Sequence, residues 1–383
     1  MEGNIVNYIT QIRGVSYKPS DLHDSLNKNS IILLRANNIN NGKINFEDVV
    51  YVDKSKVSET QVLRKNDILI CASSGSKKLV GKAASFNESI ECTFGAFCKV
   101  IRPRNILGSY LSAFFQSEYY KFHISQLANG ANINNIKNEH INSFSIPERS
   151  FEEQKEISYK VSSLNRIIES YNRELELLDE LIKARFVEMF GDNKYEELAV
   201  EKVCTSIVDC PHTTPKYNGD LRNPAIRTSE IKKGFITWDT MKYVSDEEYI
   251  ERTARLKPQQ GDIVYGREGT FGNAAILPKG YKFCLGQRVM LLRPNNEFCI
   301  SQYLLRALIS DEVYNQALAK NNASTVAHVN VKDVKNFMIP VPPLELQNQF
   351  ASFVEEIDKS RLRELLAIKQ IKLLLHDSWF LFY

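Results

Sequence analysis

Hydrophobic residues follow two alternating patterns along the chain, and each pattern occurs twice. Short apolar runs bounded by Gly, Asn and Ser predict strands at residues 30–35, 67–70 and 97–101, and again at 262–265, 273–277 and 289–292. A longer apolar run after each set predicts a helix, at 108–127 and at 299–319. These patterns predict two compact α+β domains, each of mixed strands and helices and of about 150 residues.

The second pattern is a heptad, with apolar residues four and three positions apart in turn, and it follows each domain. The first seam consists of Ile157, Val161, Leu164, Ile168, Tyr171, Leu175, Leu178 and Ile182. The second, at an offset of 193, consists of Phe350, Val354, Ile357, Ile368, Ile371 and Leu375, with Arg361 and Glu364 at its other two positions. One small domain cannot cover so long a stripe, so we expect the two helices to pair as a coiled coil. Two helices that each lie on their own domain are the alternative.

The first half of the chain recurs in the second half in the same order. Asp67 matches Asp262 and Gln154 matches Gln347, and three further matches, which begin at Arg35, Ile101 and Phe144, bring the offsets to a range of 191 to 195. Ordered matches at nearly one offset indicate a duplicated unit. We therefore expect a domain at 1–150, a helix at 151–191, a second domain at 192–343 and a second helix at 344–383.

Two equal units can bury equivalent helical stripes against each other through a pseudo-two-fold axis. If the axis crosses the helices, they form an antiparallel coiled coil with one domain at each end. Each helix of about 39 residues at ~1.5 Å per residue would be close to 60 Å long. Two similar domains held at a fixed separation suggest a ruler for a long polymer.

Composition and charge leave the partner open. The chain has 49 basic and 46 acidic side chains and a net charge of +3, which fits either an ordinary surface or a local patch for a polyanion. Its seven cysteines are scattered, and it shows neither a signal peptide nor a long apolar run. We expect reduced thiols, a cytoplasmic protein and no membrane association.

Motifs for catalysis are missing from the sequence. The glycines at 75 and 81 are one residue too far apart for a phosphate loop, and Ala83 replaces its Ser or Thr. The spacing of Cys204, Cys210 and His212 does not suit a metal site. We expect no enzyme, metal or cofactor in this chain. An enzyme with diverged motifs and a coiled-coil scaffold without DNA readout are the alternatives.

Polar loop residues of both domains are suited to nucleic acid, although each of them, taken singly, fits an ordinary polar loop better than a DNA contact. Arg pairs with guanine, Asn and Gln pair with adenine, and Lys and Ser hold phosphates. The candidate DNA contacts are Tyr17, Lys18, Arg35, Asn37, Ser73, Lys77, Lys78, Lys82, Lys216, Tyr217, Arg227, Ser229, Arg267, Thr270, Gln287, Arg288 and Thr325. Loops that differ between the copies are where different sequences would be read.

Three segments resemble one family. They are residues 267–277 (REGTFGNAAIL), 325–333 (TVAHVNVKD) running into 339–347 (IPVPPLELQ), and 181–192 (LIKARFVEMFGD). They look like the target recognition domains and central helix of specificity subunits of type I restriction–modification systems. The order of domain, helix, domain and helix is similar too, and the resemblance covers essentially the whole chain.

The resemblance implies that each domain reads one half of a split target on double-stranded DNA and that the helix pair sets the gap. It further implies docking of two methyltransferase subunits and, in the full complex, two restriction subunits. S-adenosylmethionine, ATP and Mg²⁺ would be used by those partners. On this basis, four residues inserted in both helices would add ~6 Å, close to two base-pair steps of about 3.4 Å.

Overall fold

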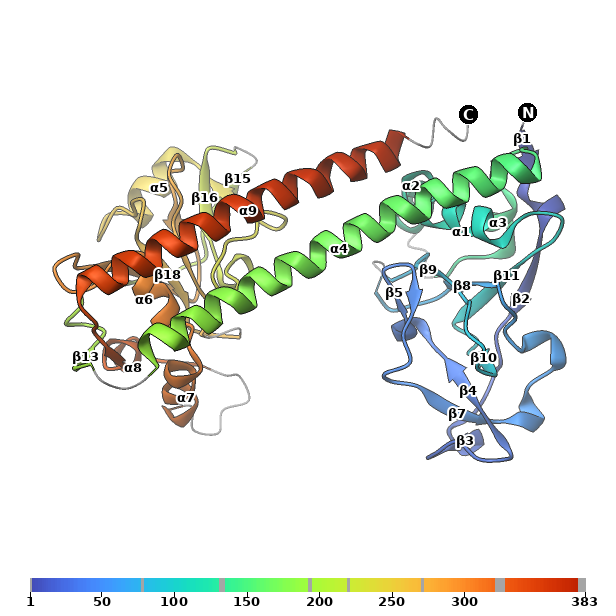
Figure 1. Ribbon diagram of the computed structural model, residues 1–383, viewed down its shortest axis with the longest axis horizontal. Helices are drawn as coiled ribbons and strands as arrows, with labels where there is room; N and C mark the ends of the chain where they lie inside the picture. The colour runs from blue at the N-terminus through green and yellow to red at the C-terminus, as the bar shows by residue number, and fades with distance from the viewer. Residues whose placement is uncertain are drawn as a thin grey trace. The chain divides into compact units, whose positions relative to one another are not determined.

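The computed structural model describes residues 2–76, 79–130, 135–191, 195–218, 221–269, 272–320 and 328–377. The chain divides into two compact units, Met1–Asn172 with Leu365–Tyr383, and Arg173–Glu364. The division cuts both long helices, α4 (Phe151–Phe190) and α9 (Leu344–Asp377). Each unit therefore contains one α+β domain and part of each long helix (Figure 1).

The first unit contains two four-stranded sheets. One is antiparallel, in the order β2 (Ile9–Arg13), β11 (Cys98–Pro103), β8 (Ile68–Cys71) and β9 (Ala83–Ser85). The other has the order β10 (Cys92–Phe94), β4 (Ser30–Leu34), β7 (Val50–Asp53) and β3 (Leu22–His23), with β10 parallel to β4. Two short pairs join β1 (Glu2–Asn4) to β12 (Ser145–Pro147) and β5 (Ile39–Asn40) to β6 (Lys43–Ile44). Helices α1 (Gly108–Gln116), α2 (Glu118–Gly130) and α3 (Asn138–Asn142) complete the domain.

The second unit repeats this topology, which supports the predicted duplication. Its antiparallel sheet has the order β14 (Cys204–Asp209), β21 (Val289–Pro294), β18 (Ile263–Gly266) and β19 (Ala274–Ile276). Its mixed sheet has the order β15 (Tyr217–Asn218), β17 (Lys242–Val244), β16 (Asn223–Ile226) and β20 (Cys284–Leu285), and β13 (Glu197–Ala199) pairs with β22 (Met338–Pro340). The helices are α5 (Asp246–Arg252), α6 (Ser301–Leu308), α7 (Asp311–Lys320) and α8 (Val331–Lys335).

Matching ion pairs hold the same strands in both copies. Asp67 is fully buried and lies 2.7 Å from Nη2 of Arg102, and Asp262 in the second unit lies 2.8 Å from Nη2 of Arg293. Each aspartate directly precedes one of the two inner strands of its antiparallel sheet (β8 or β18), and each arginine lies on the other inner strand (β11 or β21). Asp67 and Asp262 therefore have the same structural role in the two copies, which agrees with the match between them in the sequence.

A matched pair of glutamines joins each long helix to its domain. The side chain of Gln154 accepts a hydrogen bond from the N–H of Leu107 at 2.9 Å, just before α1. Gln347 accepts one from the N–H of Ile300 at 3.0 Å, just before α6. Each glutamine therefore satisfies an unpaired N–H at the start of a core helix.

The single helix predicted at 108–127 is in fact two helices, α1 and α2, and the one predicted at 299–319 is α6 and α7. The hydroxyl of Ser117 accepts a hydrogen bond from the N–H of Tyr120 at 3.2 Å, and Ser310 accepts one from Val313 at 3.3 Å. Both serines act as N-caps that begin a second helix. The prediction of one continuous helix at each place is therefore wrong.

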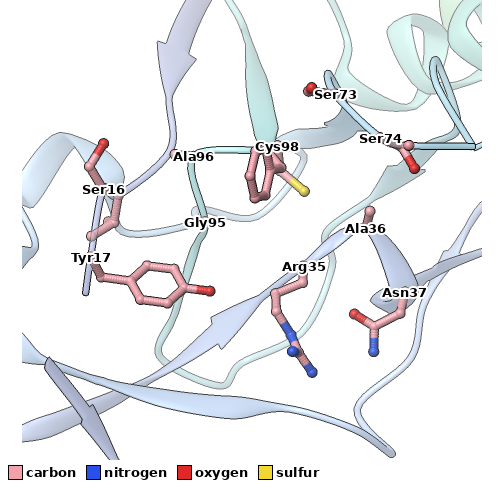
Figure 2. A pocket seen from close by; sticks show the side chains of 13 residues that line it. Ser16, Tyr17, Arg35, Ala36, Asn37, Ser73, Ser74, Gly95, Ala96 and Cys98 are labelled. Atoms are coloured by element: carbon pink, nitrogen blue, oxygen red, sulfur yellow. The ribbon is translucent and has the colours of Figure 1, made fainter. Parts of the chain in front are cut away.

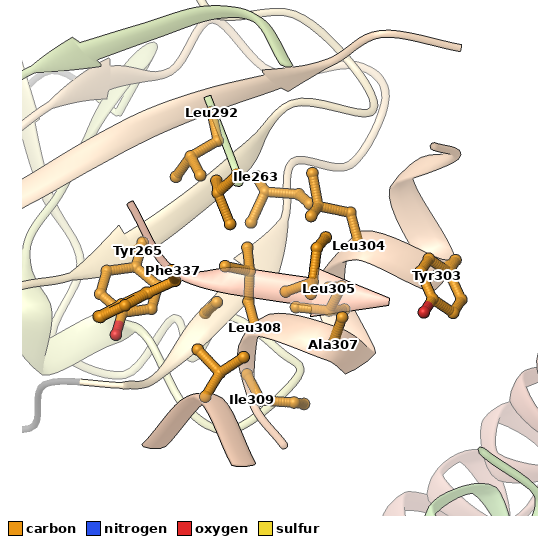
Figure 3. Packing of buried hydrophobic residues seen from close by; sticks show 14 of the residues in the cluster. Ile263, Tyr265, Leu292, Tyr303, Leu304, Leu305, Ala307, Leu308, Ile309 and Phe337 are labelled. Atoms are coloured by element: carbon orange, nitrogen blue, oxygen red, sulfur yellow. The ribbon is translucent and has the colours of Figure 1, made fainter. Parts of the chain in front are cut away.

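The larger hydrophobic core of each domain lies between its antiparallel sheet and its first core helix. Figure 3 shows Leu304 and Leu308 of α6 packed beside Ile263 and Leu292 of the sheet. In the first unit Leu111 of α1 packs with the equivalent strands.

The predicted heptad positions are the least exposed stripe of each long helix. Every seam residue is buried or half-buried, whereas Leu177 and Leu181 beside the seam are exposed. The ends of the two stripes, however, also pack against the domains. Ile157 and Val161 pack on the core of the first unit, and Ile182, Phe350 and Val354 belong to the core of the second. A domain surface therefore covers part of each stripe.

Within the second unit the two long helices also contact each other. The rings of Phe190 and Phe350 are 5.7 Å apart, and Asp179 forms an ion pair with Arg361. Residue numbers fall along α4 as they rise along α9, so the helices run antiparallel over this stretch. None of the described helices is both long and apolar enough to cross a membrane.

Candidate nucleic-acid interface

Four loops of the first unit surround a pocket of about 600 Å³ (Figure 2). The loops follow β2, β4 and β8 and connect β10 to β11. Its lining includes four predicted DNA contacts, Tyr17, Arg35, Asn37 and Ser73. The structure therefore brings together residues that are up to 56 positions apart in the sequence (from 17 to 73).

One carboxylate positions the two donors in this pocket. Oδ2 of Asp48 lies 3.2 Å from Nη2 of Arg35 and accepts a 2.7 Å hydrogen bond from the side chain of Asn37. Asn38 accepts a hydrogen bond from the N–H of Arg35 at 2.8 Å, which fixes the start of the loop. Donors held in this way lose less conformational freedom on binding an anion or a base edge.

The turn from β10 to β11 forms another wall of the pocket. The N–H of Cys98 donates to the carbonyl of Gly95 at 2.8 Å, so Phe97 lies at the tip of a closed turn. A side chain at Gly14 would come within 2.1 Å of the Gly95 carbonyl oxygen, so only glycine permits this close approach. The prediction that residue 97 belongs to a strand is wrong, because β11 begins at Cys98 and Phe97 is 70% exposed.

The thiols of the first unit are poorly suited to reaction. Cys98 lines the pocket, yet burial raises the pKa of its thiol to about 12 and that of Cys71 to about 11. At pH 8 a thiol with so high a pKa stays almost entirely protonated, and only the thiolate form is nucleophilic. All seven cysteines are free, and six of them are buried.

We therefore expect Ellman's reagent at pH 8 to modify the folded chain at least ~100-fold more slowly than the unfolded chain, which should expose all seven thiols. Cys204, the one cysteine that is only half-buried, is expected to react first. Several thiols reacting at the unfolded-chain rate would show that the core opens readily.

Equivalent loops of the second unit hold most of its predicted contacts. The N–H of Gly95 donates to the carbonyl of Leu34 at 2.9 Å, and the N–H of Gly286 donates to that of Ile226 at 2.6 Å, so the two turns have equivalent places in the repeat. Gln287 and Arg288 follow Gly286, and the other loops carry Arg227, Ser229 and Arg267.

Two arginines of this set are turned toward the protein. Arg227 donates to Glu230 through Nε at 3.0 Å and Nη2 at 2.5 Å. Burial acts to raise the pKa of the Glu230 carboxyl, but hydrogen bonds from Arg227, Ser229 and Thr240 outweigh burial and hold that pKa below its usual value. Arg227 and Ser229 therefore stabilise the loop. Their contact with DNA stays a prediction, and their side chains have few hydrogen-bond donors left for it.

Arg267 is 6% exposed and pairs with Asp209 at 2.9 Å. A side chain so enclosed cannot reach a base edge without moving. The outward position in this region belongs to Arg288, whose Nε lies 2.9 Å from Glu268 and whose side chain is 62% exposed.

The remaining predicted contacts are less well placed. Gln287 donates to the hydroxyl of Thr214 at 2.9 Å, and the ring of Tyr217 lies 4.7 Å below the ammonium of Lys242. Lys18 and Lys216 are exposed, while Lys82 is half-buried and is not part of the pocket. Lys77, Lys78, Thr270 and Thr325 lie outside the described residues.

One supporting residue is missed by the sequence analysis. Arg252 is 6% exposed and donates to the carbonyls of Leu285, Gly286 and Thr213 at 2.8, 3.0 and 3.2 Å. It thus fixes two loops of the second unit from behind. A lone arginine in a short helix carries no sequence signal for this role, because all three acceptors are backbone atoms.

Among the described residues, no group of three or more His, Cys, Asp or Glu side chains is arranged to hold a metal ion.

Comparison with known proteins gives one consistent result. Relatives include the Type I restriction enzyme EcoKI specificity subunit of Escherichia coli K12, 29% identical over 91% of this chain and 80% of that protein. The StySPI specificity subunit of Salmonella potsdam is 41% identical over 45% of this chain and 38% of that protein. A solved structure from a type I restriction–modification system has a similar fold, with a TM-score of 0.51 and 16% identity over 96% of both chains. The model of the type I restriction modification DNA specificity domain matches residues 9–180 and 219–373. The chain belongs to the family of type I restriction modification DNA specificity domains.

Proposed function

We propose that this chain is the specificity subunit of a type I restriction–modification complex and that each of its domains reads one half of a split target on double-stranded DNA. The observation that carries the proposal is the duplicated set of four loops at equivalent strand ends. The first set gathers Tyr17, Arg35, Asn37 and Ser73 around one pocket, and the second presents Gln287 and Arg288. Because the loops differ between copies on the same scaffold, the two half-sites differ in sequence.

The long helices supply the second part of the proposal. They form an antiparallel coiled coil that sets the separation of the half-sites. The ion pair between Asp179 and Arg361 and the contact between Phe190 and Phe350 support this arrangement. Exposed leucines beside the seam, such as Leu177, Leu362 and Leu366, offer apolar surface for two methyltransferase subunits. Two restriction subunits would join them in the full complex.

Catalysis belongs to the partners in this proposal. Methyl transfer from S-adenosylmethionine, and the ATP- and Mg²⁺-dependent steps, would take place on the methyltransferase and restriction subunits. This chain supplies recognition and spacing.

The test is methylation of a random DNA library by the chain together with its methyltransferase subunits. We expect methyl groups on one split, asymmetric target, and none when either the chain or the methyltransferase is omitted. Exchanging residues 192–343 for those of a relative should change one half of the target and leave the other half intact.

Binding should also weaken as salt rises, with a slope near −0.9 per phosphate contact. Methylation by the chain alone, or a change in both half-sites after the exchange, would refute the proposal. Binding that ignores both sequence and salt would favour a scaffold.

A further inference from the structure

Phe97 and Arg288 occupy the same position in the two copies. The carbonyl of Phe97 accepts a hydrogen bond from the N–H of Ala72 at 2.9 Å, and the carbonyl of Arg288 accepts one from the N–H of Arg267, also at 2.9 Å. In each copy this bond joins the last residue of the turn before one inner strand (β11 or β21) to the first residue after the neighbouring inner strand (β8 or β18). The scaffold therefore presents an aromatic ring in one copy and a guanidinium in the other.

Phe97 is an unusual phenylalanine for its domain. It is 70% exposed, whereas Phe94, Phe114 and Phe115 nearby in the sequence are at most 2% exposed. Its carbonyl accepts from both Ala72 and Ser73 at 2.9 Å, so the backbone under the exposed ring is fixed. The ring borders a pocket whose other walls carry hydroxyl, amide and guanidinium groups. An apolar group held rigidly among polar donors suits a ligand with an apolar spot on a polar edge.

Arg288 is presented outward as well. Its backbone has φ of 64°, in the left-handed region that side-chain-bearing residues seldom adopt. Nε lies 2.9 Å from Glu268, which orients the side chain, and the group is 62% exposed. Among the described residues, neither terminal nitrogen of Arg288 forms an ion pair, so the two can donate two parallel hydrogen bonds to a planar acceptor pair.

We propose that this turn is a specificity position in both domains, at which Phe97 contacts the methyl group of a thymine and Arg288 pairs with O6 and N7 of a guanine. In the major groove the thymine methyl is the apolar feature and guanine offers the paired acceptors. The proposal rests on the proposed function, because it assumes that each domain reads a half-site. It adds the class of base that one residue in each domain selects.

The test for Phe97 removes the methyl group from the DNA. With the complex of the chain and its methyltransferase subunits, thymines in the half-site of the first domain are replaced one at a time by deoxyuridine. At one position the wild type should bind about four-fold more weakly, the factor that corresponds to about 0.8 kcal/mol per buried CH₂ group. Phe97→Ala should bind thymine and deoxyuridine equally at that position. Phe122→Ala is the control, because Phe122 is also exposed, at 59%, but lies on α2 and is not part of the pocket lining.

The test for Arg288 removes one acceptor from guanine. Replacing one guanine of the second half-site by 7-deazaguanine should weaken the wild type at least about five-fold, the lower end of the discrimination of a bidentate pair. Arg288→Ala should lose this sensitivity and should accept other bases at that position. Its preference in the first half-site should not change, which serves as the internal control for folding.

The possible failures can be told apart. If no complex methylates a split target, the proposed function fails. If the target is split but deoxyuridine has no effect on the wild type, or has an equal effect on Phe97→Ala, the role of Phe97 is wrong. If Phe97→Ala weakens binding to thymine and to deoxyuridine by the same factor, and also reduces DNA bending, the ring is inserted between bases. That result likewise overturns methyl recognition.

Discussion

Lengthening both long helices by four residues is expected to move the two half-sites of the target apart by about two base pairs. Four helical residues add ~6 Å, and two base-pair steps span about 6.8 Å. The best places are after Asn172 in α4 and after Glu364 in α9, the points at which the two compact units divide. Repeating residues 169–172 there places a second Tyr171 seam position in α4, and repeating 361–364 repeats the two polar seam positions, Arg361 and Glu364, in α9.

The measurement is the target of methylation by the complex, read from a library in which the spacer length varies. We expect loss of at least ~30-fold at the original spacing, which corresponds to two mismatched base pairs at about 1 kcal/mol each, the lower end of the usual cost. Lengthening α4 alone is the control, because it shifts one seam against the other and should impair folding or assembly without producing a new spacing. An unchanged spacer in the doubly lengthened chain would show that the helices do not set the distance.

Patterns that repeat along the chain could be predicted from the sequence. The heptad positions are buried or half-buried in both helices, and the match of Asp67 with Asp262 marks equivalent ion pairs. Both signals depend on spacing, and spacing survives when residue identities change. The duplicated order of the strands follows from the same offset.

The orientation of individual loop side chains could not be predicted. Arg227 and Arg267 are sequence candidates for DNA contact, yet their guanidinium groups face Glu230 and Asp209. Those carboxylates become neighbours only through tertiary structure or a tight local turn. Phe97 shows the opposite error, because an apolar residue beside an apolar run predicts a strand and burial. Its exposure depends on the turn that closes between Gly95 and Cys98.

Replacing Asp67 by Ala is expected to lower the free energy of unfolding of the first unit by about 3–5 kcal/mol, the usual cost of removing one partner of a buried ion pair. The carboxylate is fully buried and accepts hydrogen bonds from Nε and Nη2 of Arg102 at 2.9 and 2.7 Å and from the N–H of Arg64 at 2.8 Å. Its loss leaves a guanidinium that is only 15% exposed without its counter-charge. The measurement is urea unfolding followed by circular dichroism.

Two further variants distinguish the effect of leaving a buried charge unpaired from the effect of losing any ion pair or side chain. Glu91→Ala removes an acidic partner from Lys54 at 3.0 Å, but both side chains are well exposed, at 60% and 44%, so the expected cost is below about 1 kcal/mol. Asp67→Leu combined with Arg102→Met removes both charges and should recover part of the stability that Asp67→Ala loses, because no unpaired charge stays in the core. If the double variant is as unstable as Asp67→Ala, then Asp67 acts through its bond to the N–H of Arg64, and the strand position depends on that turn instead of on the ion pair.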